Sequence, residues 1–221
     1  MAKSKMCMEL FERYSKLREA VKNQFSTTTQ GLVDKALIFA EERMEGLTRY
    51  DGTPMLDHAA EVAHIVATEV GLGRNSTVAS ILHDVVRIEA KRNDDDNFEL
   101  LLNTIHKEFG AEVVGIVIGL SNISELKLNT QSDQASDFRD MIVAYSEDPR
   151  VILIKLADRL EVMRNIDMFP PKKQLQTFSI RVGSGTGTPC AIAISAGYET
   201  YRTVRRDAKI CSRKGLAGVA N

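Results

Sequence analysis

Apolar side chains recur every three or four residues from Glu9 to about Asn165, and almost no stretch alternates apolar with polar residues. The first period is that of a helix with one buried face, whereas alternation is typical of half-buried strands. A chain of 221 residues is long enough for one domain with a substantial core and a tail. The sequence therefore predicts an all-α domain.

Breaks in this period divide the region into helices. Pro54 and Pro149 suit first helical turns, and Gly46, Gly71 and Gly110 suit the ends of helices. The predicted helices span residues 6–24, 30–46, 54–70, 76–91, 98–108, 111–121, 135–146 and 148–166.

The composition changes after the last predicted helix. Residues 172–221 hold nine Lys or Arg and two Asp or Glu, although the whole chain has a net charge of -1. The Gly- and Thr-rich stretch 182–190 lacks the P-loop lysine and a preceding apolar strand, so it does not predict a nucleotide-binding loop. We predict a helical domain over residues 6–175 and a basic, Gly/Thr-rich tail over 176–221 that is poorly structured.

Composition also limits the cellular setting. No apolar run approaches the ~20 residues that span a bilayer, and the N-terminus lacks the apolar core of a signal peptide. Three cysteines without CxxC spacing argue against a disulfide framework and fit a reducing cytoplasm. A net charge near zero does not favour nucleic acid as a partner, although the basic tail leaves that as a minor alternative. We predict a cytoplasmic protein and leave its oligomeric state open.

Ionisable residues interrupt two helices whose pattern predicts burial. The His83-Asp84 doublet does so in one helix and Asp158 in another. A buried carboxylate is costly unless it is paired or bound to a metal ion, so these residues suggest a shared cation, with His58 as a fourth ligand. The alternative is structural: an Asp158–Arg159 ion pair and core histidines with protein partners.

This set of donors has a defined chemistry. Two imidazoles and two carboxylates suit a divalent ion such as manganese, iron or zinc, with positions left for water and substrate. Such an ion lowers the pKa of bound water and neutralises phosphate charge, both of which assist phosphoester hydrolysis. The residues favour a metal-dependent hydrolase without naming its substrate.

Three segments, taken in order, resemble the HD domain of RelA/SpoT proteins. They are residues 49–58 (RYDGTPMLDH), 82–86 (LHDVV) and 155–160 (KLADRL), and the resemblance covers roughly residues 30–175. It implies an HD-type helical bundle and removal of the 3′-pyrophosphate from the stringent-response nucleotides ppGpp and pppGpp. The ligands that it implies for a manganese ion, or another divalent metal, are His58, His83, Asp84 and Asp158. Relatives continue into a synthetase domain, which the tail does not resemble, so no synthetase activity is expected.

Residues near the ligands are candidates for holding the nucleotide. The resemblance implies this role for Arg49, whose alternative is a solvated loop arginine. Tyr50 stands where the family commonly has Lys, and its ring suits stacking on a purine. Arg159, beside the last ligand, and Arg87 are further candidates for binding substrate.

Departures from the family concern catalysis. Active relatives usually have Glu-Asp where this chain has Arg87-Ile88, and neither of these side chains accepts a proton from water near neutral pH. We therefore expect Asp84 and Arg87 to act in catalysis, with Arg87 binding the leaving pyrophosphate and Glu61 substituting for the missing carboxylates. Glu89 is a second possible substitute, and both glutamates have the alternative of being solvated helix residues.

The family's His-Asn pair is also missing, because Glu161 and Val162 occupy its place. Valine cannot replace an amide that contacts the nucleotide. A second function therefore stays open, that of a catalytically weakened HD domain acting as a nucleotide-binding regulatory module.

Overall fold

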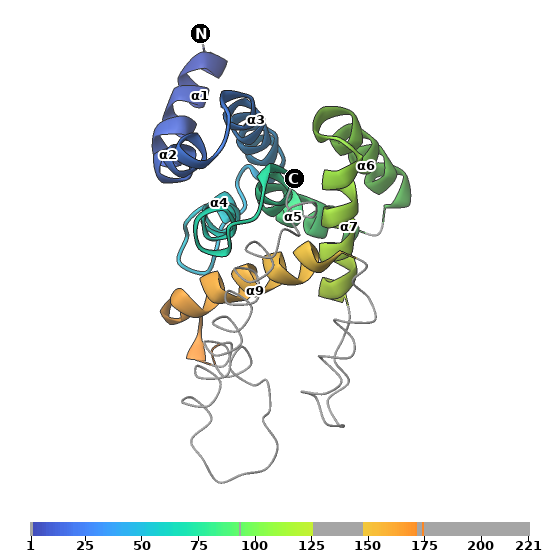
Figure 1. The fold of residues 1–221 in the computed structure, drawn as a ribbon. Coiled ribbons are helices and arrows are strands. Elements are labelled where there is room, and N and C mark those ends of the chain that lie inside the picture. Colours follow the sequence, from blue (N-terminus) through green and yellow to red (C-terminus); the bar gives the residue numbers. More distant parts are fainter. Residues whose placement is uncertain (1, 93, 126–147, 172–173, 175–221) are drawn as a thin grey trace, which may run out of the picture.

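The computed structural model describes residues 2–92, 94–125, 148–171 and 174, which form a bundle of α-helices (Figure 1). Among these residues there is no strand, so the predicted all-α class is confirmed. The predicted helix over 135–146 and the tail over 176–221 lie outside the described residues. The helices are α1 (Ala2–Arg13), α2 (Ser15–Gln24), α3 (Thr27–Met44), α4 (Met55–Ile65), α5 (Arg74–Ala90), α6 (Asp95–Phe109), α7 (Ala111–Glu125) and α9 (Pro149–Arg164), with a π-helical turn at Val66–Val70 and a 3-10 turn at Ile166–Met168.

The first predicted helix is divided in two by a bend at Tyr14, where φ is −102° and ψ is 26°. The Tyr14 side chain is buried, and its hydroxyl donates a hydrogen bond to Asp57 Oδ1 on α4 at 2.9 Å. Arg13 adds a bidentate ion pair to the same carboxylate. The bend therefore coincides with a contact to a distant helix. The periodicity of the sequence does not show this bend.

Helix α5 lies at the centre of the bundle and packs against α3, α4, α6 and α7 (Figure 1). Every residue from 76 to 86 is buried. A helix that is buried on all sides has no polar face, and this explains the long apolar segment in which the His-Asp doublet stands. The doublet is therefore held in the most enclosed part of the domain.

Helix α9 begins at Pro149, a residue that suits a first helical turn because it has no backbone N–H to leave unpaired. Asp148 caps the helix by accepting a hydrogen bond from the Arg150 backbone N–H at 2.9 Å. The helix packs against α4 and α7 and also contacts α5. This course brings the end of the described chain beside the two earlier helices that carry candidate ligands.

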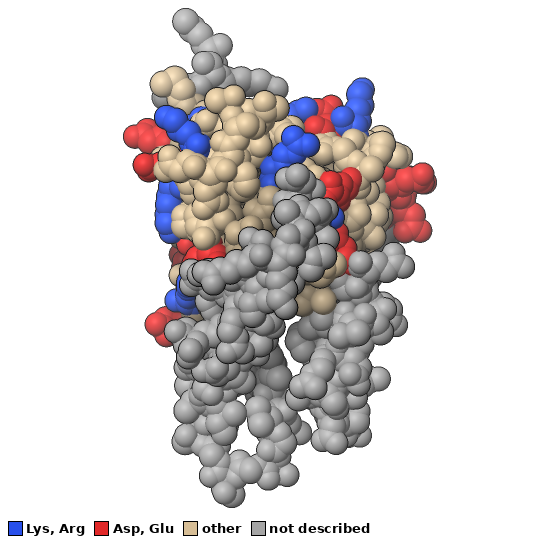
Figure 2. Space-filling view, in the orientation of Figure 1, with Lys and Arg blue, Asp and Glu red and all other residues tan. Residues whose placement is uncertain are grey.

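Charged side chains are spread over the described surface. On the face in Figure 2, blue and red side chains are interspersed among larger tan areas, and the described part of this face carries no large patch of one sign. None of the helices that the structure describes is long and apolar enough to cross a membrane.

Close packing of α7 on α9 gives a stability prediction. A Cβ at Gly119 would lie 2.9 Å from Cγ2 of the buried Val151, closer than side chains tolerate. We expect Gly119→Ala to lower the free energy of unfolding in urea by about 1–3 kcal/mol through overpacking. Gly115→Ala is the matched control on the same helix, because nothing lies within 4 Å of its Cβ. It should stabilise by about 0.5–1 kcal/mol, and equal effects of the two variants would contradict the close approach.

Candidate metal centre

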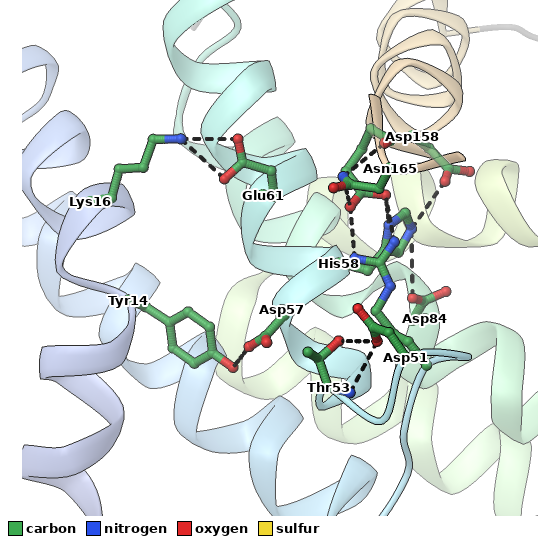
Figure 3. A network of polar contacts seen from close by, with 12 residues as sticks. Tyr14, Lys16, Asp51, Thr53, Asp57, His58, Glu61, Asp84, Asp158 and Asn165 are labelled. Carbon is green, nitrogen blue, oxygen red and sulfur yellow. Dashed lines mark hydrogen bonds and ion pairs between the residues drawn. The ribbon is translucent and has the colours of Figure 1, made fainter. Parts of the chain in front are cut away.

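Side chains from three helices meet where α4, α5 and α9 come together (Figure 3). One donor atom from each of His58, His83 and Asp84 lies within 4.8 Å of the others. His58 Nε2 is 3.9 Å from Asp84 Oδ2 and 3.1 Å from Asp158 Oδ1, and His83 Nε2 is 3.4 Å from Asp84 Oδ1. Metal–ligand bonds of about 2–2.2 Å correspond to donor separations of about 3–4 Å, so this spacing fits a shared ion.

His83 is oriented by the backbone of its own helix. Its Nδ1 is 2.6 Å from the carbonyl oxygen of Ser80, which only accepts hydrogen bonds, so Nδ1 carries the proton. Burial lowers the pKa of His83, and the ring is therefore neutral near pH 7. A neutral ring protonated at Nδ1 has its lone pair at Nε2, which is the atom that faces Asp84.

His58 is oriented by a carboxylate instead. Its Nδ1 lies 2.5 Å from Oε2 of Glu161, one turn beyond Asp158 on α9. Burial opposes a charge on this ring, but hydrogen bonds with Asp158 and Glu161 outweigh it and raise the pKa of His58 to about 9. Binding of an ion at Nε2 therefore requires release of a proton from His58.

Asp84 is the most enclosed of the candidate ligands, with a fully buried side chain. It forms an ion pair with Arg87, yet neither of its oxygens accepts a hydrogen bond of good geometry. Burial raises the pKa of the Asp84 carboxyl, but the positive charges around it hold that pKa below its ordinary value. A buried anion whose oxygens lack hydrogen bonds is the kind of group that a divalent ion satisfies.

Asp158 shares its two oxygens between two neighbours. Oδ1 lies 3.1 Å from His58 Nε2, and Oδ2 accepts a hydrogen bond from Lys155 Nζ at 2.6 Å. Burial raises the pKa of Asp158, but the hydrogen bond from His58 and the charge of Lys155 hold it well below its ordinary value. The structural alternative of an Asp158–Arg159 ion pair is not what the described residues form.

Arg49 does not point freely into the site. Its guanidinium makes two hydrogen bonds to Glu161, at 2.8 and 3.1 Å, and its side chain is 10% exposed. The loop that holds it is itself fixed, because Arg49 N–H donates to Thr53 O and Gly52 adopts a φ of +85° that favours glycine. This placement does not support Arg49 as an open contact for the nucleotide, nor as a solvated loop residue.

Tyr50 and Arg159 have surroundings different from those of Arg49. Tyr50 is 57% exposed, and its ring packs at 57° against Phe169 with 5.3 Å between centroids. Arg159 is half-buried, and no hydrogen bond or ion pair joins it to another residue in the part of the chain that the structure describes. Burial lowers the pKa of Arg159, although the charge of Asp158 opposes this.

The acidic substitutes expected near the ligands lie elsewhere. Glu61 is bound by Lys16 at 3.0 Å and points toward α2, away from His58 (Figure 3). Glu89 pairs with Arg92 at 3.0 Å. The structure therefore does not support Glu61 as a group that activates water, because its oxygens are held on another side of α4.

Arg87 and Ile88, which replace the family's acidic pair, have different surroundings. Arg87 lies against Asp84, at the centre itself. Ile88 packs against the core and lines a cavity of about 460 Å³ between α3, α5 and α6. Only the first of the two positions faces the candidate ligands.

Sequence reasoning missed one residue of the centre altogether. It read Glu161 as part of a lost nucleotide contact, whereas the structure places this side chain, 0% exposed, against His58 and Arg49. Its spacing of three residues from Asp158 puts the two carboxylates on one face of a helix, and that was the available signal.

Comparison with known proteins agrees with this arrangement. Residues 36–180 match the family of HD domains. The chain belongs to the HD domain family. Four candidate ligands and the helices that carry them all fall within the matched region of this HD domain, and the resemblance to RelA/SpoT proteins is confirmed by the relatives that it matches.

Three relatives illustrate the similarity. A putative chloroplastic GTP diphosphokinase of Arabidopsis thaliana is 39% identical over 150 residues, which are 64% of this chain and 16% of that protein. A guanosine-3′,5′-bis(diphosphate) 3′-pyrophosphohydrolase of Haemophilus influenzae is 36% identical over 138 residues, 62% of this chain and 19% of the relative. The bifunctional (p)ppGpp synthase/hydrolase SpoT of Escherichia coli is 36% identical over 141 residues, 63% and 19% respectively. The HD-domain chain thus spans less than a fifth of the length of these relatives.

Proposed function

We propose that this HD domain is a metal-dependent phosphohydrolase that removes the 3′-pyrophosphate from ppGpp or pppGpp. The observation that carries the proposal is the buried group of His58, His83 and Asp84, whose donor atoms lie within 4.8 Å of one another, with Asp158 of α9 3.1 Å from His58 Nε2. The names of the relatives, which include a guanosine-3′,5′-bis(diphosphate) 3′-pyrophosphohydrolase, support the choice of nucleotide. A related guanine nucleotide would use the same site.

The ligands proposed for the ion are His58, His83, Asp84 and Asp158. Manganese, or another divalent ion, would lower the pKa of water and neutralise phosphate charge. Half-buried Arg159 is suited to a phosphate oxygen, because it lacks a partner among the described residues. Water adds to the 3′-phosphorus, the ribose 3′-oxygen leaves, and ppGpp yields GDP and pyrophosphate.

Tyr50 is the residue that we propose to stack on the guanine. Its ring contacts Phe169 with 5.3 Å between centroids and is 57% exposed, an accessible aromatic surface of the kind on which a base stacks. Tyr50→Ala is expected to raise the Kd for ppGpp by about 5- to 150-fold, the equivalent of the about 1–3 kcal/mol that one stacked base contributes. Tyr50→Phe keeps the ring and should bind within about twofold of the parent. Equal affinity of the alanine variant would remove Tyr50 from the binding site.

A second candidate function is that of a nucleotide-binding regulatory module with weakened catalysis. The ion pair between Arg87 and Asp84 favours it, because a cation occupies the position of a family carboxylate. The two functions share the ligands and the nucleotide and differ only in turnover.

An assay of products separates these functions. The full chain with added manganese is incubated with ppGpp, and GDP and pyrophosphate are measured beside a chelated sample, while Kd for ppGpp is measured in parallel. Manganese-dependent release of both products supports the hydrolase. Binding of ppGpp without product over hours supports the regulatory module, and the absence of both binding and turnover would remove ppGpp as the ligand.

A further inference from the structure

Glu161 is a fully buried carboxylate with a complete set of donors around it. Oε2 contacts His58 Nδ1 at 2.5 Å and Arg49 Nη2 at 3.1 Å, while Oε1 accepts from Arg49 Nη1 at 2.8 Å and Asn165 Nδ2 at 2.9 Å. Burying a carboxylate is costly unless such partners are present. These four contacts come from the Arg49 loop, from α4 and from the end of α9, so the carboxylate is held by several elements of the fold.

An ionised carboxylate accepts hydrogen bonds and does not donate them, so the proton in the contact with Glu161 belongs to His58 Nδ1. The guanidinium of Arg49, which stays protonated, contacts both oxygens of Glu161 at 2.8 and 3.1 Å, so this carboxylate lies opposite a permanent positive charge. With Nδ1 protonated, Nε2 is the ring atom that faces Asp158 and Asp84. Glu161 thereby fixes the orientation of the His58 ring through Nδ1.

The second imidazole of the centre is fixed in another way. His83 donates from Nδ1 to the backbone carbonyl of Ser80, four positions before Asp84 on the same helix. His58 depends instead on a side chain 103 residues away in the sequence. A change at position 161 therefore acts on one histidine and leaves the other untouched.

We infer that Glu161 is a positioning residue of the metal centre, which orients His58 Nε2 toward the ion and ties the Arg49 loop to the same carboxylate. The inference rests on the proposed metal-binding function. Helix α9 then supplies both a ligand, Asp158, and the group one turn later that aims a ligand of α4. Loss of such an outer hydrogen-bond partner typically weakens metal binding by about 10- to 100-fold.

The test measures manganese affinity of the full chain by calorimetry for Glu161→Gln. We expect the Kd to rise by about 10- to 100-fold. Because this variant leaves Arg49 without its counter-charge, the neutral pair Arg49→Gln with Glu161→Gln is measured as well and should show the same loss. The matched control is Asp34→Asn, which removes a carboxylate from another bidentate arginine pair, that with Arg18, and should keep the parent Kd within about twofold.

A second readout does not depend on metal. The Nδ1 proton of His58 should give a slowly exchanging NMR signal in the parent, which Asp34→Asn retains and Glu161→Gln loses. Folded Glu161 variants with the parent's manganese Kd would overturn the inference. If the parent shows the protected proton but binds no manganese, the proposed metal function fails, and the orienting contact stands as a structural one only.

Discussion

Replacement of Arg87 by Glu is expected to raise the rate of ppGpp hydrolysis by about 10²- to 10⁴-fold, the usual contribution of a general base. Arg87 lies one turn after Asp84 and contacts its carboxylate, so a side chain at this position reaches the metal centre. A guanidinium stays protonated and cannot take a proton from water. A carboxylate at this position, one turn after Asp84, would supply that missing acceptor. Initial rates of GDP release at saturating ppGpp and manganese measure the effect.

Arg87→Gln is the matched control, because it removes the positive charge without adding a base. It should raise the rate far less than Arg87→Glu. Equal gains would mean that the ion pair with Asp84, rather than the absence of a proton acceptor, limits the hydrolysis rate of the parent. Parent turnover of about 1 per second or faster, ordinary for an enzyme, would show that the acidic residue is dispensable here.

The structure alters what is expected of the neighbouring position. Arg87 and Ile88 together replace the family's acidic pair, but Ile88 packs against the core and lines the cavity between α3, α5 and α6. Ile88→Asp should therefore add nothing to the rate. It should lower the free energy of unfolding by about 1–3 kcal/mol, because a carboxylate replaces a packed apolar side chain.

Asp158→Asn is expected to have the second largest effect, the loss of manganese binding and of turnover together. The substitution keeps the shape of the side chain but removes an anionic donor that lies 3.1 Å from His58 Nε2. The affinity for manganese should fall by more than the about 100-fold that loss of an outer partner costs. Turnover at a fixed manganese concentration should fall in proportion to the bound fraction of the enzyme.

Asp57→Asn provides the control for this prediction. Asp57 is also an ion-paired carboxylate, one residue before His58, but it binds Arg13 and Tyr14 on the other side of α4 (Figure 3). Its substitution should weaken the packing of the bend between α1 and α2 on α4 without changing manganese affinity. If Asp158→Asn bound manganese like the parent, Asp158 would be removed from the ligand set.

Much of the fold followed from the sequence because helical periodicity is a local property. The ends of α7 and α9 lie within a few residues of the predicted positions, and Pro54 and Pro149 stand at the starts of α4 and α9 as predicted. The bend at Tyr14 did not follow, since the contact with Asp57 that accompanies it joins residues 43 apart. Periodicity alone carries no information about such partners.

The candidate site shows the same division. Three of the residues carried over from the family, His58, His83 and Asp84, lie close together, and Asp158 lies 3.1 Å from His58 Nε2, because the motifs record which positions face one another. The environment of Arg49 was not predictable, because its partner Glu161 lies 112 residues away and departs from the family pattern. In the sequence, that glutamate counts only as a replacement in the family's missing His-Asn pair. In the structure, it is buried against His58.

The central claim is that one divalent ion, held by the four ligands, is required for hydrolysis of ppGpp. The most direct test is a manganese titration of chelated protein in which melting temperature and GDP release are read from the same samples. GDP release should rise with the bound fraction and saturate at one ion per chain, and the melting temperature should rise over the same additions and continue upward with the logarithm of free manganese. At about 100 times Kd, binding stabilises by about 2.7 kcal/mol, which corresponds to roughly 5–11 °C for a domain of this size. Turnover that is equal in chelated and manganese-loaded protein would contradict the claim.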